Sequence, residues 1–228
     1  MNTDLHIHSC LSPCGDDAMT PEMLVGMSLL NGVELIALTD HNSVRNCPAA
    51  AAAAEAYGIG FIPGCEVTTA EDVHCVCLFP DLERAMAFGT ELENYLAPVA
   101  NRPEIFGNQI ILHPDGSTET YERLLLPACS ISIVDLPAFA RDFGAICYPA
   151  HVDRDANGLF AMLGLWPEDL ITPAVEIRNI LPAGVPDGLK TIMASDSHYL
   201  HALPQNGFPL PLEEASFRGL AKYLKVDL

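Results

Sequence analysis

The feature that most constrains the fold of this chain is the alternation of short apolar runs with stretches of helical periodicity. The runs are bounded by polar, glycine or proline residues, which is typical of buried strands. We predict strands at residues 3–8, 35–39, 60–66, 73–79, 145–150, 175–177 and 191–194. Strands that alternate with helices indicate an α/β domain with largely parallel strands, and seven are enough for a barrel-like closure.

The predicted helices carry recognisable start and stop signals. Thr20-Pro21 places a capping hydroxyl and a proline at the start of one helix, and Pro48 and Gly58 bracket an alanine-rich second helix. Further helices are predicted at residues 81–96, 135–143 and 213–224. The segment around 107–126 breaks this rhythm, so we predict a small hairpin there that decorates a single domain spanning residues 1–228.

Charge and hydropathy restrict the partners and the location of the chain. There are 30 acidic and 11 basic residues, giving a formal charge of −19. Because such a surface repels polyanions, we expect no long duplex nucleic acid as a partner, although short nucleotides remain compatible. No apolar run reaches the roughly 18–20 residues that span a bilayer, and residues 1–6 lack a signal-peptide pattern. We therefore expect a cytoplasmic protein without a membrane partner, whose eight cysteines are free thiols.

Histidine placement is the strongest indication of chemistry. Six of the eight histidines lie at or near predicted strand ends, beside carboxylates. His6 and His8 are two residues apart on one strand, so both imidazoles point to the same face. Other polar residues at strand ends are His41, Glu66, His74, His151, Asp196 and His198. In a barrel of parallel strands these ends converge, which predicts a shared site for two or three divalent ions such as zinc, manganese or iron.

These residues form an ordered set of motifs that resembles the PHP family, the polymerase and histidinol phosphatase superfamily. The motifs are Asp4-Leu5-His6-Ile7-His8-Ser9, Leu38-Thr39-Asp40-His41, Gly64-Cys65-Glu66, Ala150-His151 and Ser195-Asp196-Ser197-His198. The resemblance covers residues 4 to 198, in the order of the family. It implies a distorted (β/α)7 TIM-like barrel of the PHP type with a metal-dependent phosphoesterase site.

The resemblance also implies how the ligands are divided among the ions. His6, His8, Glu66 and Asp196 match the set for a first metal, and Asp16, His41 and His198 match the set for a second. Glu66 would bridge to a third ion that His74 and His151 complete. Asp16 and Asp17 are adjacent, and the distance back from Thr20-Pro21 favours Asp16 as the ligand.

The predicted activity is hydrolysis of a small phosphorylated substrate, either a phosphate monoester or a nucleotide or oligonucleotide end. A metal-bound hydroxide would attack the phosphorus. Arg154, Arg178 and Arg45 are candidates for binding the phosphate, with Arg154 favoured. His198 or His151 is the candidate for protonating the leaving oxygen.

Two other functions fit the same residues. The first is a non-catalytic metal-binding module of the PHP type that acts with a partner protein. The second is hydrolysis of a C–N bond, although no lysine lies near the early motifs, where related barrels often use one as a ligand. The sequence does not specify the substrate, the metal or the oligomeric state.

Overall fold

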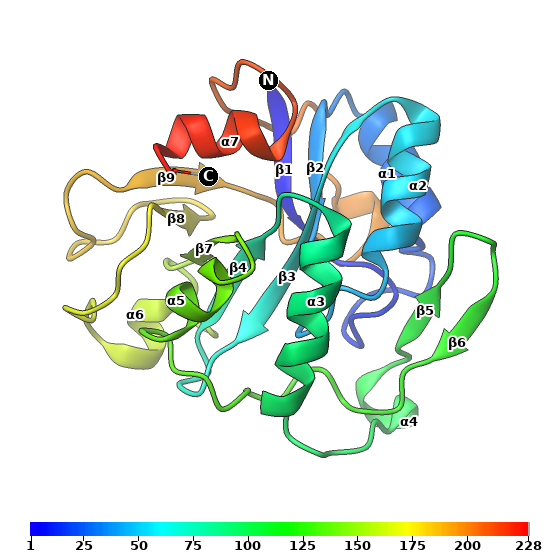
Figure 1. Ribbon diagram of the computed structural model, residues 1–228, viewed down its shortest axis with the longest axis horizontal. Helices are drawn as coiled ribbons and strands as arrows, with labels where there is room; N and C mark the ends of the chain where they lie inside the picture. The colour runs from blue at the N-terminus through cyan, green and yellow to red at the C-terminus, as the bar shows by residue number, and fades with distance from the viewer. Residues whose placement is uncertain (228) are drawn as a thin grey trace.

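A curled six-stranded sheet organises the computed structural model, which describes residues 1–227 (Figure 1). In spatial order its strands are β10 (Phe208–Pro209), β1 (Asn2–Ile7), β2 (Leu35–Leu38), β3 (Gly60–Thr68), β4 (His74–Leu78) and β7 (Ile146–Pro149). Strands β1, β2 and β3 are parallel, whereas β4 is antiparallel to both β3 and β7. Every one of the seven predicted strands is present, so the α/β prediction is confirmed.

The two remaining predicted strands, β8 (Ala174–Ile177) and β9 (Lys190–Met193), form a separate parallel pair. Backbone hydrogen bonds beyond the strand ends connect this pair to β7, at one edge of the curled sheet, and to β1, which is next to the other edge. Val152 N donates to Glu176 O at 2.9 Å, and His8 N donates to Ser197 O at 2.9 Å. A regular (β/α)7 barrel is therefore not what the structure displays, because β4 is reversed and the β8–β9 pair shares no ladder with the six-stranded sheet.

Most helices begin and end near the predicted residues, but the last starts at Phe217 instead of residue 213, and the third ends at Leu92 and is followed by a 3-10 turn. Thr20 accepts a hydrogen bond from Met23 N at the start of α1 (Pro21–Leu30), and α2 (Cys47–Tyr57) ends at Gly58, whose φ of 73° is left-handed. Asp81 caps α3 (Leu82–Leu92) and Ser216 caps α7 (Phe217–Leu224). The shorter helices are α4 (Pro103–Phe106), α5 (Leu136–Arg141) and α6 (Leu159–Leu163), with 3-10 turns η1 (Glu93–Tyr95) and η2 (Leu200–Ala202). None of the helices within residues 1–227 is long and apolar enough to cross a membrane.

An antiparallel hairpin of β5 (Ile110–Leu112) and β6 (Thr118–Thr120) projects at the right of Figure 1. The buried Asn46 side chain anchors it, because its amide donates to Ile110 O at 3.0 Å and accepts from Leu112 N at 2.8 Å. Ile110 N also donates to Cys10 O at 2.9 Å. The hairpin thus supports the loop that follows β1.

The alternation of side chains along β4 shows how the sheet separates its core from its polar site. Cys75 and Cys77 pack into an apolar cluster between the sheet and helices that include α3. Val76 and Leu78 lie on the opposite face, in a second cluster that α7 covers. His74 shares the face of Val76, two residues earlier. The polar site therefore lies beyond one end of this second cluster.

Candidate metal centre

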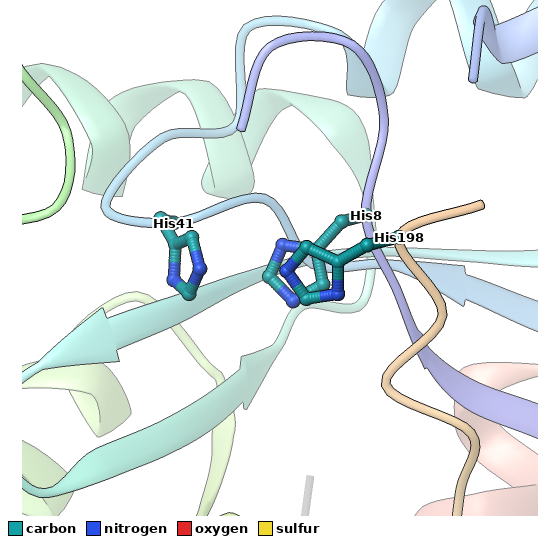
Figure 2. Close-up of side chains that lie close together, drawn as sticks. All are labelled: His8, His41 and His198. Carbon is teal, nitrogen blue, oxygen red and sulfur yellow. The ribbon is translucent and has the colours of Figure 1, made fainter. Parts of the chain in front are cut away.

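Six histidines from distant parts of the chain meet at this end of the sheet. The rings of His8 and His198 stack with centroids 4.0 Å apart, and His41 lies 4.4 Å from His8 (Figure 2). His74 and His151 continue the cluster, with ring centroids 5.3 Å apart. The predicted convergence of strand ends is therefore what the backbone produces.

The tightest group consists of four fully or largely buried side chains, His6, His8, Glu66 and Asp196. His6 Nε2 lies 3.2 Å from Glu66 Oε1 and 3.5 Å from Asp196 Oδ1. His8 Nε2 lies 3.3 Å from Glu66 Oε2 and 3.2 Å from Asp196 Oδ1. These four residues are the set that the sequence assigns to a first metal.

Hydrogen bonds at the far side of each ring fix where the imidazole protons lie. His6 Nδ1 is 3.0 Å from both oxygens of Glu176, an acceptor-only group, so Nδ1 carries the proton. Ser12 Oγ donates its single proton to Asp40 at 2.8 Å, so it accepts from His8 Nδ1, also at 2.8 Å. In neutral imidazoles the two Nε2 lone pairs then face each other 3.1 Å apart. Two lone pairs at this distance repel unless a cation lies between them.

Two further groups surround the first one. His8, His41 and His198 form one of them, and His41, Glu66 and His74 form the other. Glu66 lies at the junction, since His74 Nδ1 and His151 Nε2 are 2.9 Å and 3.1 Å from its Oε1. Glu66 Oε2 and His41 Nδ1 lie 2.9 Å apart, yet both are buried and lack a hydrogen-bond partner. Such orphaned buried atoms are costly unless an ion satisfies them.

The spacing of the donor atoms fits a divalent ion. Ligand atoms about 2.1 Å from a tetrahedral ion lie about 3.4 Å from one another. The four residues of the tightest group present nitrogen and oxygen atoms 3.1–3.5 Å apart. Imidazole and carboxylate donors suit zinc, manganese and iron. The residues therefore fit the ions that the sequence predicts.

The electrostatics show how strongly the carboxylates act on the imidazoles. Burial lowers the pKa of His6, but the charges of Glu176, Glu66 and Asp196 outweigh it and raise that pKa well above its usual value. Burial also lowers the pKa of His8, but hydrogen bonds to Asp196 and Glu66 outweigh this effect and raise that pKa to about 9. These pKa shifts mean that the negative charge of the site attracts a cation.

The carboxylates respond in the opposite direction. Burial raises the pKa of Glu66, but the charges of His74, His6 and His41 lower it well below the usual value. The pKa of Asp196 is lowered in the same way, against burial, by His6 and His8. Glu66 and Asp196 are therefore ionised near neutral pH, as ligands of a metal must be.

Backbone conformation at the strand ends aims several of these side chains. His151 has a φ of 28° and Asp196 a φ of 52°, in the left-handed region that most non-glycine residues avoid. Such conformations cost about 1–3 kcal/mol and persist where the surrounding structure imposes them. Two backbone hydrogen bonds, each 2.9 Å long, impose these conformations here. Val152 N donates to Glu176 O, and Asp196 N donates to His6 O.

The cluster opens into a pocket of about 560 Å³, which is lined by both polar and aromatic side chains. Arg154 and Arg178 stand on one side, where their Nη1 atoms lie 2.5 Å and 3.5 Å from Asp196 Oδ2. Each arginine side chain is 41% exposed, so it can also reach a ligand in the pocket. Tyr199 and Cys14 are further lining residues.

Two predicted site residues lie outside this cluster. Asp16 is exposed, and its carboxylate accepts a hydrogen bond from Ala18 N at 2.8 Å. The alternative, Asp17, is also exposed and accepts from Asn108 at 2.7 Å. Arg45 is held by Glu93, with Nη2 and Oε1 2.6 Å apart, in a separate pocket beside α3. A local hydrogen bond thus holds the Asp16 side chain away from the histidines, and an ion pair does the same for Arg45.

Sequence reasoning missed two residues that position the ligands. Glu176 is fully buried in β8, accepts from His6 Nδ1 and accepts from His151 N at 3.2 Å. The Ser12 hydroxyl lies between Asp40 and His8, because it donates to the Asp40 carboxylate and accepts from His8 Nδ1. The signal that could have revealed Glu176 is its place as a glutamate inside an otherwise apolar strand, Ala174–Ile177. Ser12 lies in an irregular loop and gave no such signal.

Comparison with known proteins gives partial relatives by sequence. A stretch of 92 residues is 40% identical to a 3',5'-nucleoside bisphosphate phosphatase of Chromobacterium violaceum, covering 39% of this chain and 31% of that protein. Another stretch of 79 residues is 29% identical to an uncharacterized protein of Methanocaldococcus jannaschii, covering 31% of this chain and 46% of that protein. The matched parts therefore span less than half of either relative.

Solved structures share the fold across nearly the whole chain. The lesion-specific endonuclease Q of Pyrococcus furiosus matches 98% of this chain and 55% of its own, with a TM-score of 0.69 and 17% identity. A protein assigned as a metal-dependent phosphoesterase from Bifidobacterium adolescentis matches 99% of this chain and 97% of its own, with a TM-score of 0.56 and 19% identity. At these identities the likeness concerns the fold.

One of these structures corrects the expectation about long duplexes. Endonuclease Q, which matches 98% of this chain with a TM-score of 0.64, is known in complex with a 27-mer duplex whose abasic lesion is at the active site. The prediction that this chain excludes a long duplex as a partner is therefore wrong. It rested on net charge, which sums the whole surface, whereas a duplex contacts one face and responds to the local potential there.

The family follows from the match of the N-terminal half together with the site geometry. The PHP domain model matches residues 4–134, more than half of the chain. That range includes the residues of four of the six clustered histidines and Glu66. The chain belongs to the PHP domain family.

Proposed function

We propose that this chain is a metal-dependent phosphoesterase that hydrolyses a phosphate ester bound in the pocket beside the histidine cluster. The observation that carries the proposal is the pair of imidazole Nε2 atoms of His6 and His8, which face each other 3.1 Å apart with two ionised carboxylates around them. This arrangement is stable with cations in place. Family membership and the named activity of the Chromobacterium violaceum relative support it.

The ligands divide among two or three divalent ions, zinc, manganese or iron. When bound, such ions lower the pKa of water and neutralise phosphate oxygens. His6, His8, Glu66 and Asp196 would hold the first, and His41 and His198 the second. Glu66 would be shared with a third, together with His74 and His151. His151 is fully buried, and its Nε2 atom is directed at Glu66 at 3.1 Å, which supports this assignment.

Arg154 and Arg178 are the residues that we propose to bind the phosphate. Each has one guanidinium nitrogen on Asp196 and remains partly exposed in the pocket. The guanidinium plane offers further N–H donors that match phosphate oxygens. A phosphate held there lies next to the ligand cluster, which is the position that an in-line attack requires.

A role in binding ions suits His198 and His151 better than proton donation. Burial, together with the charge of His8, lowers the pKa of His198 to about 3, so its imidazole is neutral near pH 7. A neutral imidazole is a good ligand and a poor acid. His151 has no exposed surface and so cannot reach a leaving group in the pocket.

The substrate class that we propose is a small phosphate monoester or a nucleotide or oligonucleotide end. The pocket volume of about 560 Å³ accommodates a molecule of this size. The bisphosphate phosphatase relative favours a nucleotide among these candidates. A terminal phosphate of a longer nucleic acid also remains compatible, because the pocket is open.

We further propose that the strands constitute one distorted (β/α)7 barrel domain with the β5–β6 hairpin as its decoration. The hydrogen bonds at Val152 and His8 support a ring of seven strands around the polar site. Strand β4 would be the reversed member of that ring.

The test is phosphate release from protein of defined metal content. The panel contains p-nitrophenyl phosphate, bis-p-nitrophenyl phosphate, nucleoside bisphosphates, single-stranded oligonucleotides and a duplex with an abasic site. We expect turnover that requires the added metal and that falls at least a hundredfold in His8→Ala and Asp196→Ala variants. Metal-loaded protein that leaves every ester intact would overturn the proposal and favour a non-catalytic metal-binding module.

A further inference from the structure

The group formed by His8, His41 and His198 contains no carboxylate. The residue expected to supply one, Asp16, is exposed and bound to its own loop. His8 is shared with the neighbouring group, so the second position has fewer ligands of its own than the first. A dication held only by neutral imidazoles lacks the negative charge that the first group obtains from Glu66 and Asp196.

Cys14 precedes Asp16 by two residues, and it is the cysteine among the residues that line the pocket. It lines the pocket together with His41 and His198. Every other cysteine is buried. Because Cys14 is exposed, packing does not fix its side chain and it is free to turn toward an ion.

The loop after β1 is built to hold Cys14 at this place. Ser12 N donates to Ser9 O at 3.1 Å and Gly15 N donates to Ser12 O at 2.8 Å, so two tight turns follow each other. A Cβ atom at Gly15 would lie 2.8 Å from Ser9 O, which explains the glycine. Asp16 N then donates to His198 O at 3.0 Å, which fixes the loop to the strand end that carries His198.

A second observation, independent of the cysteine, indicates an ion in contact with His41, on the side of the adjoining group of His41, Glu66 and His74. His41 is only 5% exposed, so water does not reach its Nδ1 atom, and this atom has no hydrogen-bond partner. It points toward Glu66 Oε2, which is also unpartnered, at 2.9 Å. A neutral imidazole nitrogen and a carboxylate oxygen this close are held together either by a well-aligned hydrogen bond or by a cation between them.

We propose that Cys14 is the anionic ligand of the second metal, in the place where the sequence predicted Asp16. This rests on the proposed metal centre. Coordination forms one sulfur–metal bond, breaks the S–H bond and releases the proton to solvent, without change of oxidation state. A thiolate favours zinc over manganese at this position, whereas a carboxylate would favour manganese.

The test uses cobalt(II) in place of the native metal, because a thiolate on cobalt produces an intense near-ultraviolet charge-transfer band that imidazole and carboxylate ligands do not. We expect this band in the wild-type protein once the second equivalent binds. The band should be lost in Cys14→Ser, which should also bind the second equivalent at least tenfold more weakly. Cys14→Asp should restore that affinity without restoring the band.

Cys10→Ser is the matched control, because Cys10 belongs to the same loop but its thiol donates to Ile110 O at 3.7 Å instead of facing the pocket. This variant should keep the band, and circular dichroism checks the fold of all four proteins. Cobalt that binds with no thiolate band, or a band that survives in Cys14→Ser, overturns the role of Cys14 and leaves the metal centre standing. A wild-type protein that binds no cobalt refutes the metal centre itself.

Discussion

The most informative perturbation of the site is Glu176→Gln, which removes one buried charge and keeps the shape of the side chain. Glu176 accepts from His6 Nδ1 with both oxygens at 3.0 Å and from His151 N at 3.2 Å. Oε1 accepts from both donors, so a glutamine carbonyl in its place keeps both bonds and puts the NH2 group against His6 Nδ1 only, where Oε2 was. The flipped amide turns its NH2 group toward both donors. The change therefore weakens the contact that orients His6, and in the flipped orientation also the contact to His151.

The expected magnitude follows from the position of Glu176 behind the ligands. Losing a residue that orients a metal-binding histidine typically lowers metal affinity about 10–100-fold. That ratio corresponds to about 1.4–2.8 kcal/mol of binding free energy. We expect the lower part of this range if the glutamine carbonyl takes the place of Oε1 and keeps both donors, and the upper part if the NH2 group takes that place.

The assay is competition with a chromophoric chelator near neutral pH, which gives the dissociation constant of the tightest metal equivalent. Glu213→Gln is the matched control, because Glu213 pairs with Lys222 on the surface and its side chain is 72% exposed. The control should bind metal as the wild type does. A Glu176→Gln protein that folds normally and binds metal within twofold of wild type refutes the argument that Glu176 orients His6.

Three further outcomes are expected. Arg154→Ala should lower kcat/KM for a phosphate monoester about tenfold to a hundredfold, since a hydrogen bond to a charged group contributes about 1.5–3 kcal/mol. Arg178→Ala should act in the same direction. An Arg45→Ala protein with an equal loss of kcat/KM would contradict the proposed pocket. Burial raises the pKa of Asp4 to about 7, so the folded chain holds a proton that the unfolded chain loses above about pH 4. The contribution of this residue to the free energy of unfolding therefore falls as pH rises from about 4 to about 7. Asp4→Asn should remove up to roughly 4 kcal/mol of that fall, measured by urea unfolding of metal-free protein, and an identical pH profile in both proteins would argue against the shift. Removing the metal with a chelator should abolish phosphate release and lower Tm, and excess zinc or manganese should restore both; activity that persists in metal-free protein would contradict the mechanism.

Local signals were sufficient for the elements and for most of the site. Short apolar runs and capping residues such as Thr20 and Asp81 act over a few residues, so they can be read without tertiary information. The convergence of histidines required only one further step, the rule that carboxyl ends of parallel strands meet.

The direction of β4 could also have been predicted. The runs 60–66 and 73–79 are separated by only six residues, whereas a parallel crossover needs about a dozen. An antiparallel pair was therefore the one arrangement that the connection permits, and the expectation of largely parallel strands obscured it.

The exposed position of Asp16 could not have been predicted in the same way. Whether Cys14, Asp16 or Asp17 faces the site depends on two consecutive turns and on the bond from Asp16 N to His198 O. That bond joins residues 182 positions apart, and no local pattern reports it. Glu176 is an intermediate case, because its burial was visible in the strand but its partner His6 was not.

The separation in sequence between the two ends of the site has a consequence for biosynthesis. The β8–β9 pair reaches the first strand through bonds between His6 and Asp196 and between His8 and Ser197. A ribosome-bound chain that has emerged only as far as β7 would present His6, His8, Glu66 and His74 without Asp196, His198 or the glutamate behind His6. The cluster is therefore complete only after the residues up to His198 have left the ribosome, and a nascent chain lacking β8 and β9 would hold metal weakly.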